Sequence, residues 1–218
     1  MAGQINRGSF LGDYAYNLAS NTNLTNYVEV GTWNGEGSTQ CLMDGLLGRP
    51  DNSCLYSLEA NIEFYNQAKR YWDSKGVSPE VLEKKLKLIY GRLTEIEDVL
   101  SVEEVRDHAI FGQHPWLEWR SRNIKEYGQC EMVLDQLPKE VDVLFLDGGQ
   151  FSTREEFRKL KHRTKVVLLD DPATYKTESI RKEIVGDRDS WEILFDKPTD
   201  RMSGTFGACK REYISLLK

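Results

Sequence analysis

Residues 26–39 constrain the fold more than any other part of the chain. The apolar, β-branched run Tyr27–Val30 predicts a short strand, the segment Gly31–Gly37 predicts a glycine-rich turn, and a helix is expected to begin at Ser38 or Thr39. Glycine lets the backbone turn sharply and approach a ligand with no Cβ in the way. The free N–H groups at the start of the helix point toward the same place. The segment therefore predicts an α/β fold that holds a nucleotide-like ligand at the end of its first strand.

The spacing of the glycines distinguishes between ligands. Dinucleotide folds carry G-x-G-x-x-G, whereas this chain has Glu29 followed by glycines in the order G-x-x-x-G-x-G. This pattern resembles the first motif of class I S-adenosylmethionine-dependent methyltransferases, in which the acid and the loop hold the amino-acid end of the cofactor. The alternative is an ordinary glycine-rich turn between a buried strand and a helix. The resemblance assigns six residues to the cofactor: Glu29, Gly31, Thr32, Gly35, Ser38 and, from the next strand, Glu59.

Glu59 ends a second apolar run, Leu55–Leu58, which predicts the next strand. An acid at this point of a doubly wound sheet can accept hydrogen bonds from both hydroxyls of a ribose. The resemblance implies this ribose contact for Glu59. The alternative is a solvated carboxylate at a strand end.

Apolar strands alternate with helical patterns along the whole chain, which favours an α/β fold with a mostly parallel sheet. With 218 residues the chain suits one domain. The resemblance implies a Rossmann-like, doubly wound, seven-stranded sheet with an antiparallel last strand. The expected strands are Tyr27–Val30, Leu55–Leu58, Leu86–Tyr90, Val141–Leu146, Lys165–Leu169, Trp191–Phe195 and Gly207–Tyr213, and the expected helices include Thr39–Leu47, Ile62–Ser74, Glu95–Val99, Thr153–Leu160 and Ser179–Val185.

Residues 105–137 form an insertion before the fourth strand that the alternation does not require. It is rich in aromatic and basic residues, among them Trp116 and Trp119. We expect a helical lid whose aromatic side chains stack on an acceptor. The alternative is an amphipathic helix whose tryptophans pack on the sheet. His108 and His114 share no helical face, so we expect solvated histidines rather than metal ligands.

Three acids follow neighbouring strands: Asp147 after the fourth, and Asp170 and Asp171 after the fifth. Three converging carboxylates repel one another, and Mg²⁺ or Mn²⁺ with oxygen ligands would relieve the repulsion. The arrangement is similar to metal-dependent sugar O-methyltransferases of the macrocin type, whose aspartates bind a divalent ion that positions an acceptor hydroxyl. The alternative is that the acids cap the next segment. The positions that carry a general base in that family are Gly149 and Gln150 here, so the base is left open.

The chain is therefore predicted to be a methyltransferase that acts on a hydroxyl of a sugar or glycan, with Asp147, Asp170 and Asp171 as both catalytic residues and metal ligands. Arg154 and Lys176 are further acceptor contacts unless they are solvated. Two alternatives stay open: a non-catalytic binding or scaffolding protein, favoured by the missing base, and a nicotinamide-dependent oxidoreductase.

A net charge of −6 gives no reason to expect nucleic acid as a partner. No apolar run is long enough to span a membrane. The four cysteines, far apart in the sequence, predict buried reduced thiols. We expect a cytoplasmic protein with a small-molecule or glycan acceptor, and a homo-oligomer is compatible with this sequence.

Overall fold

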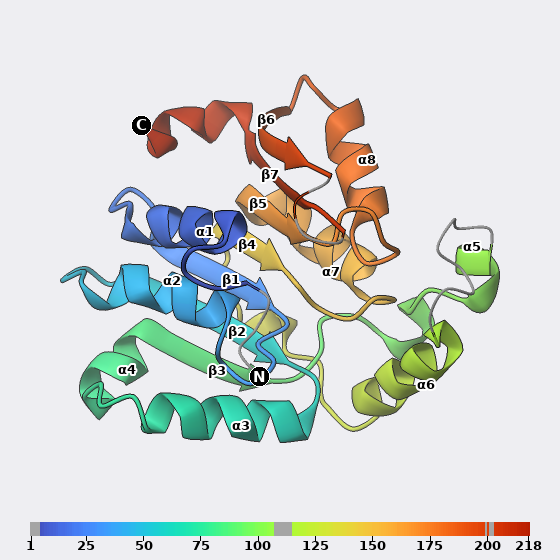
Figure 1. Cartoon of the computed structure of the whole chain (residues 1–218), viewed down its shortest axis with the longest axis horizontal. Helices are drawn as coiled ribbons and strands as arrows, with labels where there is room; N and C mark the ends of the chain where they lie inside the picture. The colour runs from blue at the N-terminus through green and yellow to red at the C-terminus, as the bar shows by residue number, and fades with distance from the viewer. Residues whose placement is uncertain (1–4, 107–114, 199, 201–202) are drawn as a thin grey trace.

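The computed structural model describes residues 5–106, 115–198, 200 and 203–218. Its centre is a seven-stranded sheet in the order β3-β2-β1-β4-β5-β7-β6 (Figure 1). All pairs are parallel except those that β7 makes with β5 and β6. The predicted α/β sheet with an antiparallel last strand is confirmed. The strands are β1 (Asn26–Val30), β2 (Cys54–Glu59), β3 (Leu86–Tyr90), β4 (Val141–Leu146), β5 (Thr164–Asp170), β6 (Trp191–Lys197) and β7 (Thr205–Lys210).

Helices connect the strands and flank the sheet. In chain order the α-helices are α1 (Phe10–Ser20), α2 (Ser38–Leu47), α3 (Ile62–Asp73), α4 (Pro79–Lys85), α5 (Val102–Arg106), α6 (Trp116–Tyr127), α7 (Thr153–Leu160) and α8 (Glu178–Gly186). The 3₁₀ segments are η1 (Ile96–Asp98), η2 (Leu134–Gln136), η3 (Lys161–Arg163) and η4 (Arg211–Leu217). The helix expected at Glu95–Val99 is reduced to the single 3₁₀ turn η1. The last strand ends earlier than predicted, since η4 begins at Arg211.

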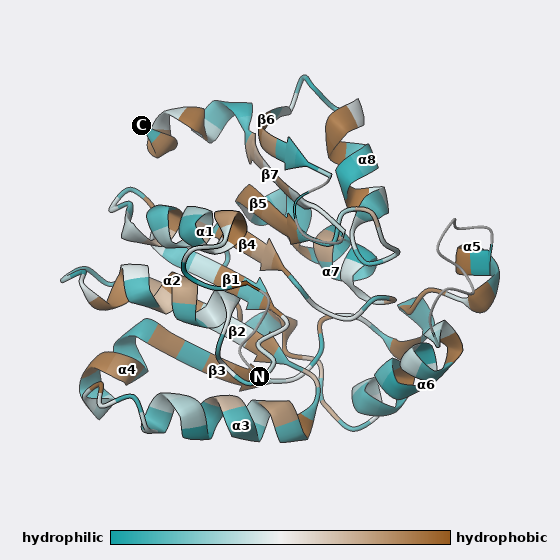
Figure 2. Ribbon diagram, viewed as in Figure 1, coloured by the Kyte–Doolittle hydropathy of each residue, from teal (hydrophilic) through white to brown (hydrophobic). Residues whose placement is uncertain are grey.

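Successive strand residues enter two different cores, as the two-residue period of a strand requires. Tyr27 and Phe145 face the core that α1, α2 and α3 cover, whereas Val28 and Leu144 face the core under α7 and α8. In Figure 2 brown is most continuous in the central strands β4 and β5, whereas the helices are of mixed colour. The sheet is therefore buried on both faces, and its carboxyl-terminal edge is left for a ligand.

The insertion lies beyond the carboxyl ends of the strands, where α5 and α6 stand apart from the sheet (Figure 1). It builds a third, smaller core. Trp116 is 4% exposed and packs edge-on against Tyr175 and Trp119, with ring centroids 5.0 Å and 4.9 Å away. Trp116 thus packs within this small core, against residues that follow the strands and not on the sheet itself. A lid role for residues 105–137 stays a prediction, and His108 and His114 lie outside the described residues.

A buried arginine ties chain segments together at the opposite edge of the sheet. Arg49 donates hydrogen bonds to the carbonyls of Ala19 and Leu24, at 2.6 Å and 2.7 Å, and contacts Asp51 at 2.5 Å. The cysteines Cys41, Cys54, Cys130 and Cys209 are free and buried, as predicted. In the described part of the chain no helix has the length and apolar character that a membrane crossing needs.

Candidate functional site

A cavity of about 530 Å³ opens at the carboxyl-terminal edge of the sheet. Its volume falls within the range of small-molecule sites. Seven of the nine predicted site residues line it: Gly31, Thr32, Ser38, Glu59, Asp147, Asp170 and Asp171. Glu29 and Gly35 do not line the cavity; each instead supports the glycine loop from behind.

The glycine loop requires glycine at its first position. Gly31 has φ +99°, and a Cβ there would lie 2.3 Å from the carbonyl oxygen of Asp147. The β1–α2 loop and the end of β4 therefore touch backbone to backbone. Gly35 has φ +84°, and a Cβ there would meet Ala68 and Trp72 of α3 at 3.0–3.1 Å. Gly35 thus serves the packing of the loop on α3 rather than the cavity wall.

Glu29 lies underneath the loop and is fully buried. Its Oε2 accepts hydrogen bonds from Thr39 at 2.6 Å and from Ser57 at 2.5 Å, and Ser57 also bonds Thr32 at 2.6 Å. Burial raises the pKa of Glu29. Its Oε1 is buried and finds no hydrogen-bond partner among the described residues. Glu29 therefore supports the loop from beneath, through Thr39 and Ser57, and does not itself reach the cavity.

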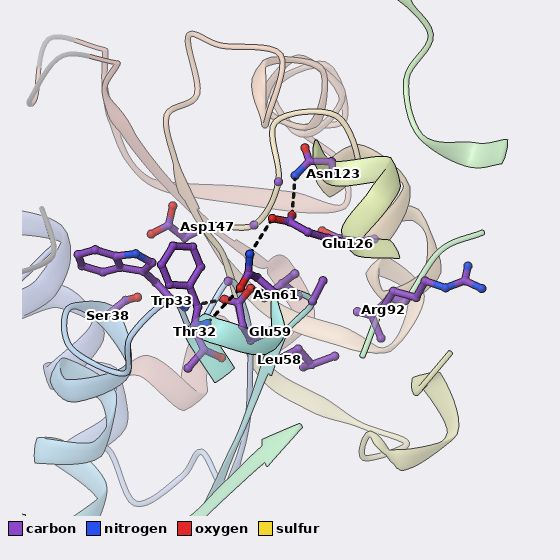
Figure 3. Close-up of a pocket in the computed structure, with 18 of the residues that line it drawn as sticks. Thr32, Trp33, Ser38, Leu58, Glu59, Asn61, Arg92, Asn123, Glu126 and Asp147 are labelled. Carbon is purple, nitrogen blue, oxygen red and sulfur yellow. Dashed lines mark hydrogen bonds between the residues drawn. The ribbon is translucent and has the colours of Figure 1, made fainter. Parts of the chain in front are cut away.

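Glu59 lies at the centre of the cavity wall (Figure 3). Its two oxygens accept the backbone N–H groups of Trp33 at 2.7 Å and Asn61 at 2.9 Å. Trp33 has φ +51°, an uncommon conformation for a bulky residue that the first of these bonds helps to hold. Burial raises the pKa of Glu59 to about 7. Each carboxylate oxygen keeps acceptor capacity, so the side chain fits a pair of ribose hydroxyls.

The insertion supplies a wall of the cavity through polar side chains, not through the tryptophans that the sequence analysis expected. Arg122, Asn123, Glu126 and Tyr127 of α6 line it. Figure 3 shows Glu126 reaching from α6 to Asn61, whose Nδ2 donates to Glu126 at 2.8 Å. Only the fold brings these two side chains together, because 65 positions separate them. Neither Trp116 nor Trp119 lines the cavity, whereas these other side chains of α6 do.

A buried Tyr127–Glu156 pair lies beside this wall. Tyr127 donates a short hydrogen bond to Glu156, which also lines the cavity. Burial raises the pKa of Glu156 to about 7. Arg154, a predicted acceptor contact, instead pairs with Glu104 and Glu155 at 2.9 Å and 2.8 Å.

The three predicted acids come together, and a lysine lies among them. One oxygen of each of Asp147, Asp170 and Asp171 lies within 4.8 Å of the others. The Nζ atom of Lys176 is 2.6 Å from Asp147, 3.2 Å from Asp170 and 2.9 Å from Asp171. Burial alone would lower the pKa of Lys176, but the three carboxylates raise it well above its ordinary value. Burial also raises the pKa of Asp147, against the effect of Lys176.

The position of Lys176 decides whether these residues fit a divalent ion. Mg²⁺ binds oxygen at about 2.0–2.1 Å, so an ion shared by the three acids would take the central place that the ammonium holds. The Lys176 side chain is only 4% exposed. The predicted convergence of the acids is confirmed, but with Lys176 in place they do not fit a divalent ion.

Solved structures share this fold at low sequence identity. A candidate O-methyltransferase from Klebsiella pneumoniae has a TM-score of 0.56 and 16% identity, covering 91% of this chain and 79% of the other. An O-methyltransferase from Bacillus cereus in complex with SAH (S-adenosylhomocysteine) gives 0.54 and 13%, covering 92% and 80%. A candidate caffeoyl-CoA O-methyltransferase from Staphylococcus aureus gives 0.55 and 15%, covering 91% and 82%.

Sequence comparison finds no matching family model and no matching curated protein. The chain therefore has the class I methyltransferase fold, and this likeness establishes its architecture. A shared fold does not determine what a chain binds or which reaction it catalyses.

Proposed function

We propose that this protein is an S-adenosylmethionine-dependent O-methyltransferase acting on a small hydroxylated molecule. The observation that carries the proposal is that one cavity contains the glycine loop, the strand-end acid Glu59 and the carboxylates of Asp147 and Asp171. The first two suit a cofactor with an amino-acid end and a ribose, and the last two suit a hydroxyl that must lose a proton. O-methyltransferases are also among the proteins that share the fold.

When bound, S-adenosylmethionine supplies a methyl group whose carbon–sulfur bond breaks with its electron pair left on sulfur. The protein has to align the acceptor oxygen with that carbon and take up the hydroxyl proton. The side chains of Asp147 and Asp171 are 27% and 25% exposed, whereas that of Asp170 is 5% exposed. We therefore assign proton uptake to Asp147 or Asp171, and assign Asp170 to holding Lys176.

A sugar or a glycan end is the acceptor class that we propose from the sequence. Two carboxylates that open into the cavity can accept hydrogen bonds from neighbouring hydroxyls of a polyol. The Staphylococcus aureus structure carries a different acceptor in its name, a caffeoyl thioester. Both classes present a free hydroxyl, so the test includes both.

Binding and turnover test the proposal separately. Titration calorimetry with SAH and with NAD comes first, and binding of NAD without SAH would sink the assignment. Transfer of a labelled methyl group is then measured with sugars, nucleotide sugars, catechols and CoA thioesters, using the Asp147→Asn and Asp171→Asn variants as controls. SAH binding without transfer to any acceptor would favour a non-catalytic binding protein, which the sequence left open.

A further inference from the structure

We infer that Lys176 is the resident cation of this site, in the place where the sequence resemblance would put a divalent metal. The role of the site rests on the proposed function. The identity of its cation rests only on the ion pairs. One ammonium contacts a carboxylate oxygen of all three acids, at 2.6, 3.2 and 2.9 Å. An ammonium has three hydrogen-bond donors, so Lys176 can give one to each acid.

The chain around Lys176 fixes its place. The hydroxyls of Thr174 and Thr177 donate to the carbonyls of Asp171 and Asp170, at 3.0 Å and 2.8 Å, which folds the turn back onto the end of β5. The neighbouring residue Tyr175 is buried, and its ring packs in the aromatic cluster with Trp116. Lys176 therefore enters the site from an anchored backbone, unlike a surface lysine that could move aside for a metal ion.

The charges give a second reason. Three carboxylates this close repel one another when they are ionised, and a group of that kind beside a buried wall needs a counter-charge. Lys176 supplies it from within the chain. A divalent ion shared by the same three acids would leave a buried ammonium beside it without its partners, which is an unfavourable arrangement.

The chemistry changes with the cation. A metal activates an acceptor by bonding its oxygen and lowering its pKa, whereas Lys176 donates hydrogen bonds to Asp147 and Asp170 and forms an ion pair with Asp171. Lys176 is thus a positioning residue. The acceptor O–H bond breaks as the oxygen bonds the methyl carbon, and the proton passes to a carboxylate oxygen of Asp147 or Asp171.

Mn²⁺ binding tests the inference without any acceptor or cofactor. The electron paramagnetic resonance signal of free Mn²⁺ is recorded with equimolar protein, and loss of signal reports binding. The wild-type protein should leave the signal unchanged. Lys176→Met frees the three acids and should bind one Mn²⁺ per chain, with a higher melting temperature when Mn²⁺ is added. Adding Asp147→Asn to that variant should abolish the gain.

The matched control is Lys182→Met, which removes a lysine that is 66% exposed on α8 and should gain no Mn²⁺ binding. Stoichiometric Mn²⁺ binding by the wild-type protein overturns the inference, as does a folded Lys176→Met variant that binds none. If this variant does not fold alone, added Mn²⁺ should restore its circular dichroism spectrum, and failure to do so also refutes the assignment. Neither result depends on SAH binding, so the proposed function is judged separately.

Discussion

Glu59 offers a direct test of the cofactor assignment through the substitution Glu59→Gln. The carboxylate accepts backbone N–H groups from Trp33 and Asn61 and keeps acceptor capacity for two ribose hydroxyls. Glutamine replaces one of these oxygens by an NH₂ group, which cannot accept a hydrogen bond. The variant therefore loses an acceptor for the loop or for the ribose, and loses the negative charge that strengthens the other bonds.

The expected loss follows from those bonds. A hydrogen bond to a charged group contributes about 1.5–3 kcal/mol, and water can replace part of the other hydrogen bonding that the variant loses. A net loss equal to one such bond weakens SAH binding roughly 10- to 150-fold. Titration calorimetry measures this directly. The matched control is Glu63→Gln, which removes the same charge from an exposed position on α3 and should leave the affinity unchanged.

The pH dependence gives this prediction a second readout. The pKa of Glu59 is raised from 4.5 to about 7 by burial. Ribose hydroxyls donate to the ionised form, so SAH affinity should rise as the pH increases through about 7 and then level off, with a slope of at most about tenfold per pH unit. Glu59→Gln should show a smaller slope. Glu156 titrates in the same range and is present in both proteins, so the difference between the slopes reports Glu59.

The stability of the ligand-free protein should change in the opposite direction. A buried acid with a raised folded-state pKa favours its protonated form, so its contribution to the free energy of unfolding is full below pH 4.5 and is lost as the pH rises through about 7. Urea denaturation at several pH values measures this. If Glu59→Gln binds SAH as tightly as the wild type does, or if its affinity keeps the full pH slope, the ribose assignment is wrong.

Three further changes test the packing around the site, each by urea denaturation. Gly31→Ala should lower the free energy of unfolding by at least about 2 kcal/mol and impair SAH binding, because its φ is +99° and a Cβ would meet a backbone oxygen at 2.3 Å. The control Gly48→Ala should be nearly neutral, because a Cβ there would have nothing within 4 Å. Trp116→Ala should cost about 3–5 kcal/mol, whereas Leu117→Ala, 55% exposed, should change stability by less than about 0.5 kcal/mol; equal effects would contradict the packing role. Arg49→Met should cost about 3–5 kcal/mol by leaving its buried partners unpaired, yet spare SAH affinity, and a loss confined to SAH binding would refute this.

The sheet could be predicted because each strand carries its own signal. Val141–Leu146 matches its predicted bounds, and neighbouring strands differ from prediction only at their ends. The last strand was extended too far, to Tyr213, because Tyr213 and Ile214 are apolar. In the fold they pack against the core from a 3₁₀ turn, where local hydrophobicity does not distinguish turn from strand.

The motif predicted which segments build the site but not which way each side chain points. Glu29 alternates with Val28 and Val30, which face the α7–α8 core, so its carboxylate lies on the other face under α2. The contact between Asn61 and Glu126 was missed for another reason. It joins an N-cap residue of α3 to the insertion, and no local pattern relates the two.

Lys176 shows where a sequence argument about charge stops. The acids could be grouped in advance, because the ends of neighbouring parallel strands meet at one edge and side chains there converge. That reasoning predicts a cation among the acids but does not identify its source, since solvent can supply a metal ion and a loop can supply a lysine. Burial statistics favour the metal, because lysine is rarely buried. The deciding feature is the turn from Asp170 to Thr177, whose hydroxyl–carbonyl bonds bring Lys176 back over the strand end. An acidic cluster at a strand edge therefore predicts a metal only after the loops that follow its acids have been searched for a lysine that can reach them.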